Sequence, residues 1–290
     1  MDYISVFRSR SGEKQVLEAY DSIMKVWPVP YEELYVETKL GATHVIVSGP
    51  ATASPVVLVH AYYASAASWY RNVERLSEHY RVYSIDIIGD PNKSKPYKPI
   101  REAEEFIQWF NEVMDKLNLE KSVFIGNSVG AFHILNFAMH ALDRVQKIVM
   151  IGPAATLLKI IPFYYHTFPG GITGWPFLVR HAIGWIENGT KLDPLFKRLF
   201  YLIMRYGKSV NQVFPFVFSD DQLGKMKTPT LLLYGDKECI YNIGLAVKRA
   251  TQLIKNIKVE IIPEANHLTA VSNPEATNNA ILNFLNETST

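Results

Sequence analysis

Residues 126–130 read Gly-Asn-Ser-Val-Gly and place Ser128 between two glycines. An apolar run, 123–125, precedes this pentapeptide, and a segment with helical periodicity follows it. A serine in this context is typical of a strained strand-to-helix turn that exposes its hydroxyl at the sheet edge. Because the pattern also arises by chance in about one chain in ten of this length, Ser128 is a nucleophile only if the chain also supplies a base, an acid and an oxyanion hole.

Eight histidines are candidates for the base. Only His267 lies in a loop just past a C-terminal strand, and that loop is expected to open on the same sheet edge as Ser128. His133 lies in the helix after Ser128 and is expected to point away from its hydroxyl. His166 and His181 lie in an inserted region, where packing or surface roles are the simpler interpretation.

Two carboxylates, Asp236 and Glu238, follow the strand 231–235, where a solvated turn is the alternative explanation for both. The order serine, acid, histidine is one in which nucleophilic triads occur on parallel sheets. His60-Ala61 ends another apolar strand. The backbone N–H groups of Ala61 and Val129 are therefore expected to converge on a developing oxyanion.

Strands alternate with helices along the chain, which predicts an α/β fold with a doubly wound, mostly parallel sheet. The final helix has a clear start, with Asn273 as N-cap and Pro274 at the first helical position. Eight strands are expected, at 35–38, 43–47, 55–60, 80–86, 123–126, 145–151, 230–234 and 259–262, with helices at 66–79, 101–118, 129–140, 242–254 and after 274.

Residues 154–227 interrupt this alternation and contain 14 aromatic residues, about 19% of the segment against 12% for the chain. The chain is therefore divided into a core domain, 1–153 and 228–290, and a helical cap, 154–227, inserted after the sixth strand. An aromatic insertion at this place would cover the sheet edge where open α/β folds bind ligands. The alternative is a helical bulge whose aromatic residues pack on each other.

Composition places few further limits on function. The chain has 290 residues, a net charge of +2 and one cysteine, Cys239, which excludes an intrachain disulfide and a multi-cysteine metal site. No long run of one charge favours nucleic acid or an anionic membrane as partner. The N-terminus has no signal-peptide apolar region and no stretch suits a membrane span, so a cytoplasmic location is expected.

Over residues 30–288 the chain resembles the α/β-hydrolase superfamily, and most closely the bacterial serine carboxylesterases with a helical cap. The resemblance rests on His60-Ala61, on Asp86 in Ile-Asp-Ile-Ile-Gly, and on the segments 126–130, 235–238 and 266–267. It implies that Glu238, three residues after the glycine of its loop, is the acid rather than Asp236. The family usually has glycine at position 61; alanine keeps the N–H but adds a Cβ.

The resemblance and the residues together predict a serine hydrolase that cleaves carboxylic esters through an acyl-enzyme, with Ser128, Glu238 and His267 as triad and with no metal or cofactor. The expected partner is a small ester with an apolar part, contacted by Tyr62, Tyr63, Trp175 and Phe218. Hydrolysis of a thioester, lactone, amide or C–C bond remains an alternative. So does a slow-turnover ligand-binding or signalling protein, which the alanine at position 61 favours.

Overall fold

The computed structural model describes residues 2–287, which form a nine-stranded sheet in the order β1-β2-β4-β3-β6-β7-β8-β9, with β5 beside β2. Pairs among β3, β4, β6, β7, β8 and β9 are parallel, and β1 and β2 are antiparallel to their neighbours. The strands are β1 Tyr31–Thr38, β2 Gly41–Ser48, β3 Pro55–Val59, β4 Arg81–Ile85, β5 Lys95–Pro96, β6 Ser122–Asn127, β7 Val145–Ile151, β8 Thr230–Gly235 and β9 Ile257–Ile262.

The predicted doubly wound sheet is confirmed, and each of its eight expected strands is present. The central strands β6 and β8 are buried along their whole length, because helices cover both faces of the sheet. The ninth strand, β5, has two residues and could not be read from an apolar pattern, since only its pairing with Gly41 and Ala42 defines it.

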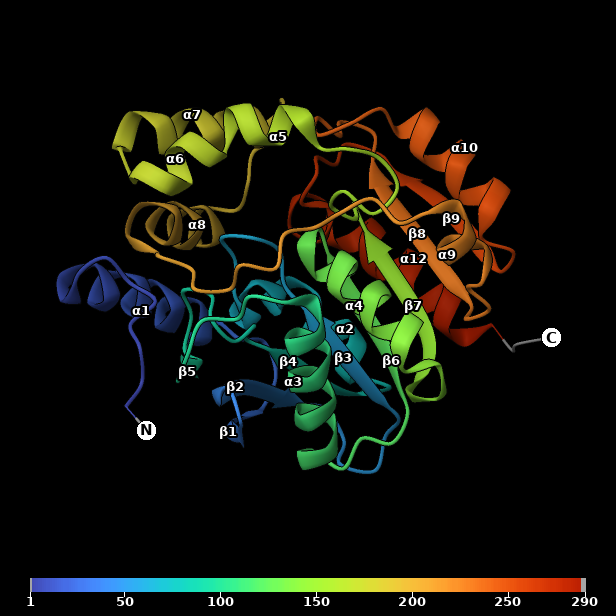
Figure 1. The fold of residues 1–290 in the computed structure, drawn as a ribbon, viewed down its shortest axis with the longest axis horizontal. Helices are drawn as coiled ribbons and strands as arrows, with labels where there is room; N and C mark the ends of the chain where they lie inside the picture. Colours follow the sequence, from blue (N-terminus) through green and yellow to red (C-terminus); the bar gives the residue numbers. More distant parts are fainter. Residues whose placement is uncertain (1, 288–290) are drawn as a thin grey trace.

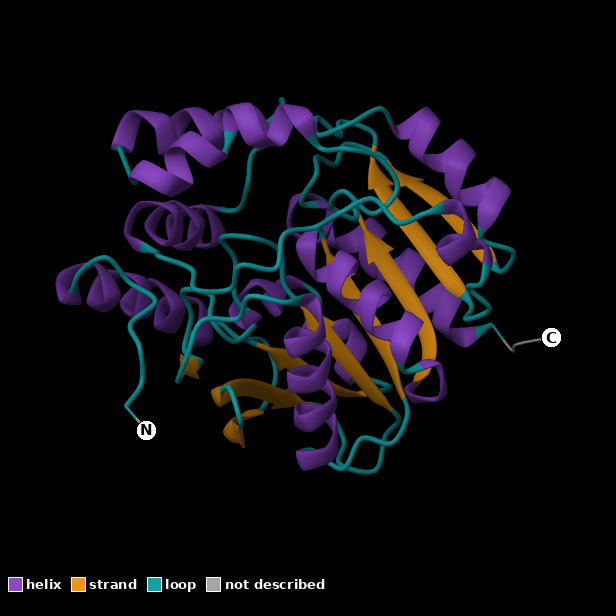
Figure 2. Cartoon of the chain, viewed as in Figure 1, coloured by secondary structure: helices purple, strands orange, loops and turns teal. Residues whose placement is uncertain are grey.

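Helices cover the two faces of the sheet in separate layers (Figures 1 and 2). One apolar core joins the sheet to α3, α4 and α10, and a second core on the other face joins it to α1, α2 and α12. These elements are α1 Arg10–Met24, η1 Ala66–Arg71, α2 Val73–Ser77, α3 Ala103–Lys116, α4 Val129–His140, η2 Leu142–Arg144, α10 Ile243–Leu253, α11 Thr269–Ser272 and α12 Pro274–Asn286. The predicted start of the last helix is confirmed, because the Asn273 side chain accepts a hydrogen bond from the Ala276 N–H at 3.2 Å.

The interval between β7 and β8 holds helices and no strand, as the sequence predicted. The helices are α5 Ile161–His166, α6 Phe168–Thr173, α7 Pro176–Glu187, α8 Pro194–Tyr206 and α9 Asp220–Gly224. In Figure 1, α5, α6 and α7 lie at the top of the molecule, beyond the carboxyl ends of β6, β7 and β8. We call residues 154–227 the cap segment; its treatment as a separate domain stays a prediction.

The N-terminal helix α1 was not predicted. It packs against α8 of the cap segment, and Figure 1 shows the two side by side. Ser9 caps it by accepting a hydrogen bond from the Gly12 N–H at 3.0 Å. Just before it, the Arg8 guanidinium donates to the carbonyls of Gly171 and Ile172 at 2.7 and 2.8 Å. The N-terminal segment thus ties the cap segment to the core.

Within residues 2–287, none of the helices combines the length and the apolar character needed to span a lipid bilayer.

Candidate active site

Ser128 lies on the turn between β6 and α4, with φ +53° and ψ −113°. A non-glycine residue with positive φ is strained, and such strain persists only where the surroundings enforce it. A Cβ at Gly126 would lie 2.5 Å from the Gly130 carbonyl carbon, and one at Gly130 would lie 2.2 Å from the Val59 carbonyl oxygen. Both glycines are therefore required for helix α4 to approach the sheet closely enough to form this turn.

The structure brings the three predicted triad side chains into one hydrogen-bonded chain. His267 Nε2 lies 2.9 Å from Ser128 Oγ, and His267 Nδ1 lies 2.7 Å from Glu238 Oε2. A carboxylate accepts from Nδ1–H, so Nε2 is left as the acceptor for the serine hydroxyl. Ser128 and His267 are 4% and 2% exposed, and the Glu238 side chain is fully buried.

The two carboxylates of the loop after β8 have different partners. The second oxygen of Glu238 accepts the Ile240 N–H at 2.8 Å, so the carboxylate is held from both sides. Asp236 is exposed and accepts the Ala265 N–H at 3.1 Å, which joins the acid loop to the histidine loop. Asp236 therefore supports the loop and does not touch the histidine ring.

Two other histidines near the sheet, His133 and His60, have partners or surroundings that do not suit a catalytic base. Burial, with a contribution from His60, lowers the pKa of His133 to about 3, and its ring stacks on Phe106 with centroids 3.8 Å apart. His60 uses both nitrogens: Nδ1 donates to the Ala61 carbonyl at 2.8 Å and Nε2 accepts the Ile87 N–H at 3.0 Å. His60 therefore has no free ring nitrogen, and among residues 2–287 no hydrogen bond joins the ring of His133 to Ser128.

Cys239, the single thiol of the chain, follows the acid directly. Burial and the neighbouring Glu238 raise its pKa to about 12. A thiol is nucleophilic as its thiolate, so Cys239 does not compete with Ser128.

The two predicted oxyanion-hole residues, Ala61 and Val129, are 4% and 1% exposed. Across the described part of the chain, no hydrogen bond from either backbone N–H is found. Buried N–H groups are nearly always paired, so two unpaired ones beside a reactive hydroxyl are unusual. Ala61 is absent from the residues with positive φ, and alanine in place of glycine therefore strains nothing here.

The loop that carries Ala61 is held by Asp86, which the sequence singled out, and by partners that it did not. Asp86 Oδ1 accepts the Ala66 N–H at 2.7 Å, and Oδ2 lies 2.8 Å from His44 Nδ1 and 3.0 Å from the Tyr20 hydroxyl. Burial raises the pKa of Asp86, but the hydrogen bond and charge of His44 outweigh it and leave that pKa below its usual value. The other ring nitrogen of His44 lies 3.0 Å from Glu33 Oε1. No local sequence signal connects these positions, because they come from α1, β1, β2 and the residue after β4.

Tyr62 and Tyr63 follow Ala61 and line a cavity of about 400 Å³ between the core and the cap segment. Tyr63 has φ +57°, and its hydroxyl presses on Gly171 of α6, where a Cβ would lie 2.0 Å away. The cavity is lined by tyrosine, phenylalanine and isoleucine side chains and by the polar Arg8, Asp90, Lys208, Ser209 and Gln212.

The other two predicted substrate contacts lie elsewhere. Trp175 is 57% exposed and lies 5.8 Å from the ring of Phe177 on the outer surface of the cap segment. Phe218 is 1% exposed and packs on Phe132 of α4 inside the core. Neither lines the cavity beside Tyr63, so this placement gives no support to a substrate contact at either residue.

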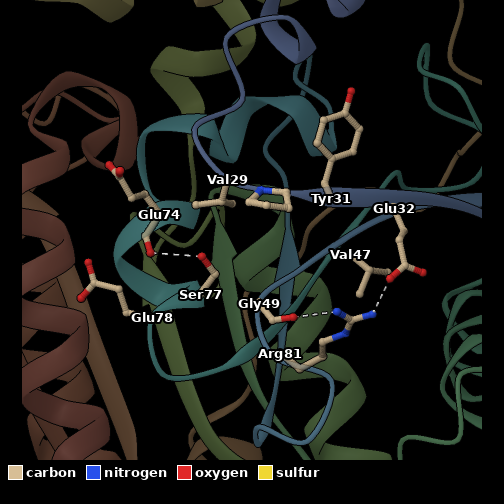
Figure 3. A pocket seen from close by; sticks show the side chains of 10 residues that line it. Val29, Tyr31, Glu32, Val47, Gly49, Glu74, Ser77, Glu78 and Arg81 are labelled. Carbon is tan, nitrogen blue, oxygen red and sulfur yellow. Dashed lines mark hydrogen bonds and ion pairs between the residues drawn. The ribbon is translucent and has the colours of Figure 1, made fainter.

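A second cavity, of about 560 Å³, lies at the opposite edge of the sheet (Figure 3). Arg81, at the amino end of β4, donates there to the Gly49 carbonyl and to the Glu32 carboxylate. The loops of the candidate site follow the carboxyl ends of β3, β6, β8 and β9, so this cavity is separated from them by the length of the strands.

Comparison with known proteins agrees with this fold. The family model described as the alpha/beta hydrolase fold matches residues 54–185. Carboxylesterase YbfK of Bacillus subtilis is 36% identical over 278 residues, covering 92% of both chains. The uncharacterized carboxylesterase nap of the same organism is 34% identical over 93% of this chain and 91% of its own.

Solved structures give the same result. The crystal structure of naproxen esterase (carboxylesterase NP) from Bacillus subtilis superposes with a TM-score of 0.90 at 32% identity, covering 96% of this chain and all of that one. The structure of carboxylesterase CesB (YbfK) from the same organism gives a TM-score of 0.89 at 34% identity, over 95% and 99% of the two chains. The chain belongs to the α/β-hydrolase family, and within it to the carboxylesterases represented by these bacterial proteins.

Proposed function

We propose that this protein is a serine carboxylesterase that hydrolyses small esters through an acyl-enzyme intermediate. The observation that carries the proposal is the chain of hydrogen bonds from Ser128 Oγ to His267 Nε2 and from His267 Nδ1 to Glu238. Nucleophile, base and orienting acid are thus in the mutual reach that such chemistry requires.

In the first half-reaction, Ser128 Oγ attacks the ester carbonyl carbon and its proton passes to His267 Nε2. Glu238 keeps the proton of the imidazole on Nδ1 and stabilises the imidazolium that forms. His267 then gives its new proton to the departing alcohol as the C–O bond breaks. Water, deprotonated by the same nitrogen, attacks the acyl-enzyme and releases the acid and free Ser128.

The Ala61 and Val129 N–H groups are proposed to receive the carbonyl oxygen when it becomes an oxyanion. Donors of this kind, fixed before the reaction, are worth roughly 10²–10³ in kcat each. Asp86 and His44 act on this step indirectly, because they fix the loop at Ala66 and not the substrate. They are positioning residues.

The cavity beside Tyr62 and Tyr63 is proposed to take the apolar part of the ester. Its volume of about 400 Å³ is in the range of small-molecule sites. Its wall combines core residues with Phe168 and Ile172 of α6, so the cap segment contributes to substrate selection.

Two measurements test the proposal. A fluorophosphonate probe is expected to label wild-type protein at Ser128 and to leave Ser128→Ala unlabelled. A series of p-nitrophenyl esters of increasing acyl length is expected to show turnover with a preference set by the cavity. Labelling without turnover of any ester, accompanied by turnover of thioesters, lactones or amides, would move the function to another acyl bond. Labelling without any turnover would favour the slow-turnover binding protein.

A further inference from the structure

The cap segment exposes an unusual amount of apolar surface. In the described residues sixteen large apolar side chains are exposed, and eight of them lie between 161 and 216 although the cap segment is about a quarter of the chain. The eight are Ile161, Tyr164, Tyr165, Ile172, Trp175, Phe177, Phe214 and Phe216. Such a concentration marks a surface that contacts something other than water.

Six of these side chains lie on α5, α6 or α7 or directly before α7, and Phe214 and Phe216 lie in the segment between α8 and α9. Helices α5, α6 and α7 pack on one another and lie at the top of Figure 1, above the carboxyl edge of the sheet. Tyr165 on α5 is 76% exposed, Phe177 on α7 is 59% exposed, and Trp175 precedes α7 at 57%. Their aromatic rings lie on the surface and not in the apolar core that Phe196, Leu199 and Phe200 of α8 share with the sheet and α1.

The positive charge of the chain is concentrated in the same segment as the exposed apolar side chains. The cap segment has nine Lys and Arg against four Asp and Glu, whereas the rest of the chain has 21 against 24. The cap segment is therefore at +5 and the remainder at −3, a division that the overall charge of +2 conceals.

Local pairing strengthens this asymmetry. Each cap carboxylate has a cationic partner: the pairs are Glu187–Lys197, Asp193–Arg71, Asp220–Arg249 and Asp221–Lys225. By contrast, Lys159, Arg180 and Lys208 have no carboxylate within ion-pair distance among residues 2–287, and all three are exposed. Arg180 is one helical turn after Phe177, so a free cation lies beside the exposed aromatic ring.

The apolar face is continuous with the cavity beside the oxyanion loop. Ile172 and Phe214, exposed by 63% and 53%, also line that cavity, together with Lys208 and Tyr63. A molecule that reaches the outer face of the cap segment is thus next to the cavity mouth.

We propose that the outer face of the cap segment docks on an anionic lipid surface. Aromatic rings of Trp, Tyr and Phe at the level of the headgroups, flanked by Lys and Arg that attract anionic lipids, are the combination by which proteins lie on a bilayer without crossing it. The negative remainder of the chain would be repelled by the same surface, so the charge division also selects the orientation. Docking goes beyond the proposed ester hydrolysis and does not depend on which bond is cleaved.

The test is co-sedimentation with phosphatidylcholine vesicles that contain or lack phosphatidylglycerol. Wild-type protein is expected to bind the anionic vesicles and to bind less as salt rises. Tyr165→Ser/Phe177→Ser is expected to bind about tenfold more weakly or worse, and Arg180→Gln about fivefold more weakly. The matched controls Leu34→Ser/Leu142→Ser and Lys121→Gln remove exposed apolar groups and a cation outside the cap and are expected to bind as wild type.

Tryptophan emission supplies a second readout, because Trp175 is the one exposed residue among the five tryptophans. Anionic vesicles are expected to shift the emission to the blue. Binding that is equal for both vesicle types, or unchanged in Tyr165→Ser/Phe177→Ser, would overturn the proposal. So would a dimer in solution that this double variant converts to a monomer, since a second copy would then be the occupant.

Turnover of a water-soluble p-nitrophenyl ester keeps this result separate from the proposed function. The double variant is expected to retain that turnover, because neither residue lines the cavity or touches the triad. Loss of vesicle binding with turnover intact supports docking alone. Vesicle binding without turnover in wild type would leave docking in place and remove the esterase proposal.

Discussion

The loops at the carboxyl edge of the sheet and the helices of the cap segment differ in how their side chains are partnered. At the sheet edge, Ser128 and His267 are almost completely buried and hydrogen-bonded to each other, and the Glu238 carboxylate is held at both oxygens. In the cap segment, Tyr165 and Phe177 are more than half exposed. Its four carboxylates each have a cationic partner, whereas Arg180 has no carboxylate within ion-pair distance among residues 2–287. The side chains of the first region are held by hydrogen bonds within the chain. The second region has exposed aromatic side chains and cations without a partner in the described residues. We infer that the core carries out the reaction and that the cap segment selects which substrates reach the core.

The largest effect is expected at Ser128. Replacing it with alanine should lower kcat about 10⁶-fold, and adding His267→Ala should cost little more, because nucleophile and base act as a unit. The fold should remain, since the hydroxyl serves the site and not the core. Steady-state rates with a p-nitrophenyl ester, alongside circular dichroism, check this. Activity of Ser128→Ala within tenfold of wild type would refute the nucleophile.

The next largest effect separates the two carboxylates after β8. Glu238→Gln should lower kcat about 10⁴-fold, because an uncharged partner no longer fixes the imidazole tautomer. Asp236→Asn is the matched control, and it should cost far less because its oxygen receives only the Ala265 N–H. Kinetics of both variants decide the matter. An inactive Asp236→Asn with an active Glu238→Gln would move the acid to position 236.

Stability of the core should depend on pH through His133. Its folded pKa is about 3, whereas a histidine in the unfolded chain titrates near 6.5. Between these values the unfolded chain binds a proton that the folded one excludes, so the free energy of unfolding falls as pH falls below about 6.5. From about pH 7 to about pH 5 this group should account for roughly 2 kcal/mol of lost stability.

Urea unfolding at the two pH values measures that loss. His133→Phe, which keeps an aromatic ring against Phe106, should reduce the dependence on pH. His79→Gln is the control, since His79 is exposed and should leave the dependence as in wild type. Equal slopes for wild type and His133→Phe would show that His133 is not the group responsible.

The smallest effects compare Tyr63, in the loop after β3, with Trp175 of the cap segment. Tyr63→Ala should change kcat/KM among acyl lengths by about 1–3 kcal/mol, because Tyr63 lines the cavity. Trp175→Ala should leave the acyl preference unchanged, because Trp175 is on the outer surface. A p-nitrophenyl ester series on both variants makes the comparison. A shifted preference in Trp175→Ala would restore that residue as the substrate contact that the sequence predicted.

Much of the core and of the candidate site could be predicted because their signals are local. A Ser between two glycines after an apolar run is typical of a tight strand-to-helix turn, and loops that follow parallel strands meet at one edge. His267 and the two carboxylates Asp236 and Glu238 were therefore placed near Ser128 from chain order, and the resemblance to the carboxylesterases favoured Glu238 over Asp236. The start of α12 was equally local, because Asn273 and Pro274 act within one helical turn.

The tertiary structure decided the features that depend on contacts between residues distant in the sequence. The group Tyr20, His44 and Asp86 joins segments 24 to 66 residues apart. Helix α1 packs on α8 of the distant cap segment, and no periodicity signals either meeting. The burial of the aromatic residues of the cap segment could not be predicted from local sequence either. Trp175 and Phe218 have similar composition around them, yet one is exposed and the other is buried, because burial depends on which face of a helix or loop meets a neighbour. Residue type determined the available chemistry, and packing of distant elements determined which groups are hidden and which are left to meet a partner.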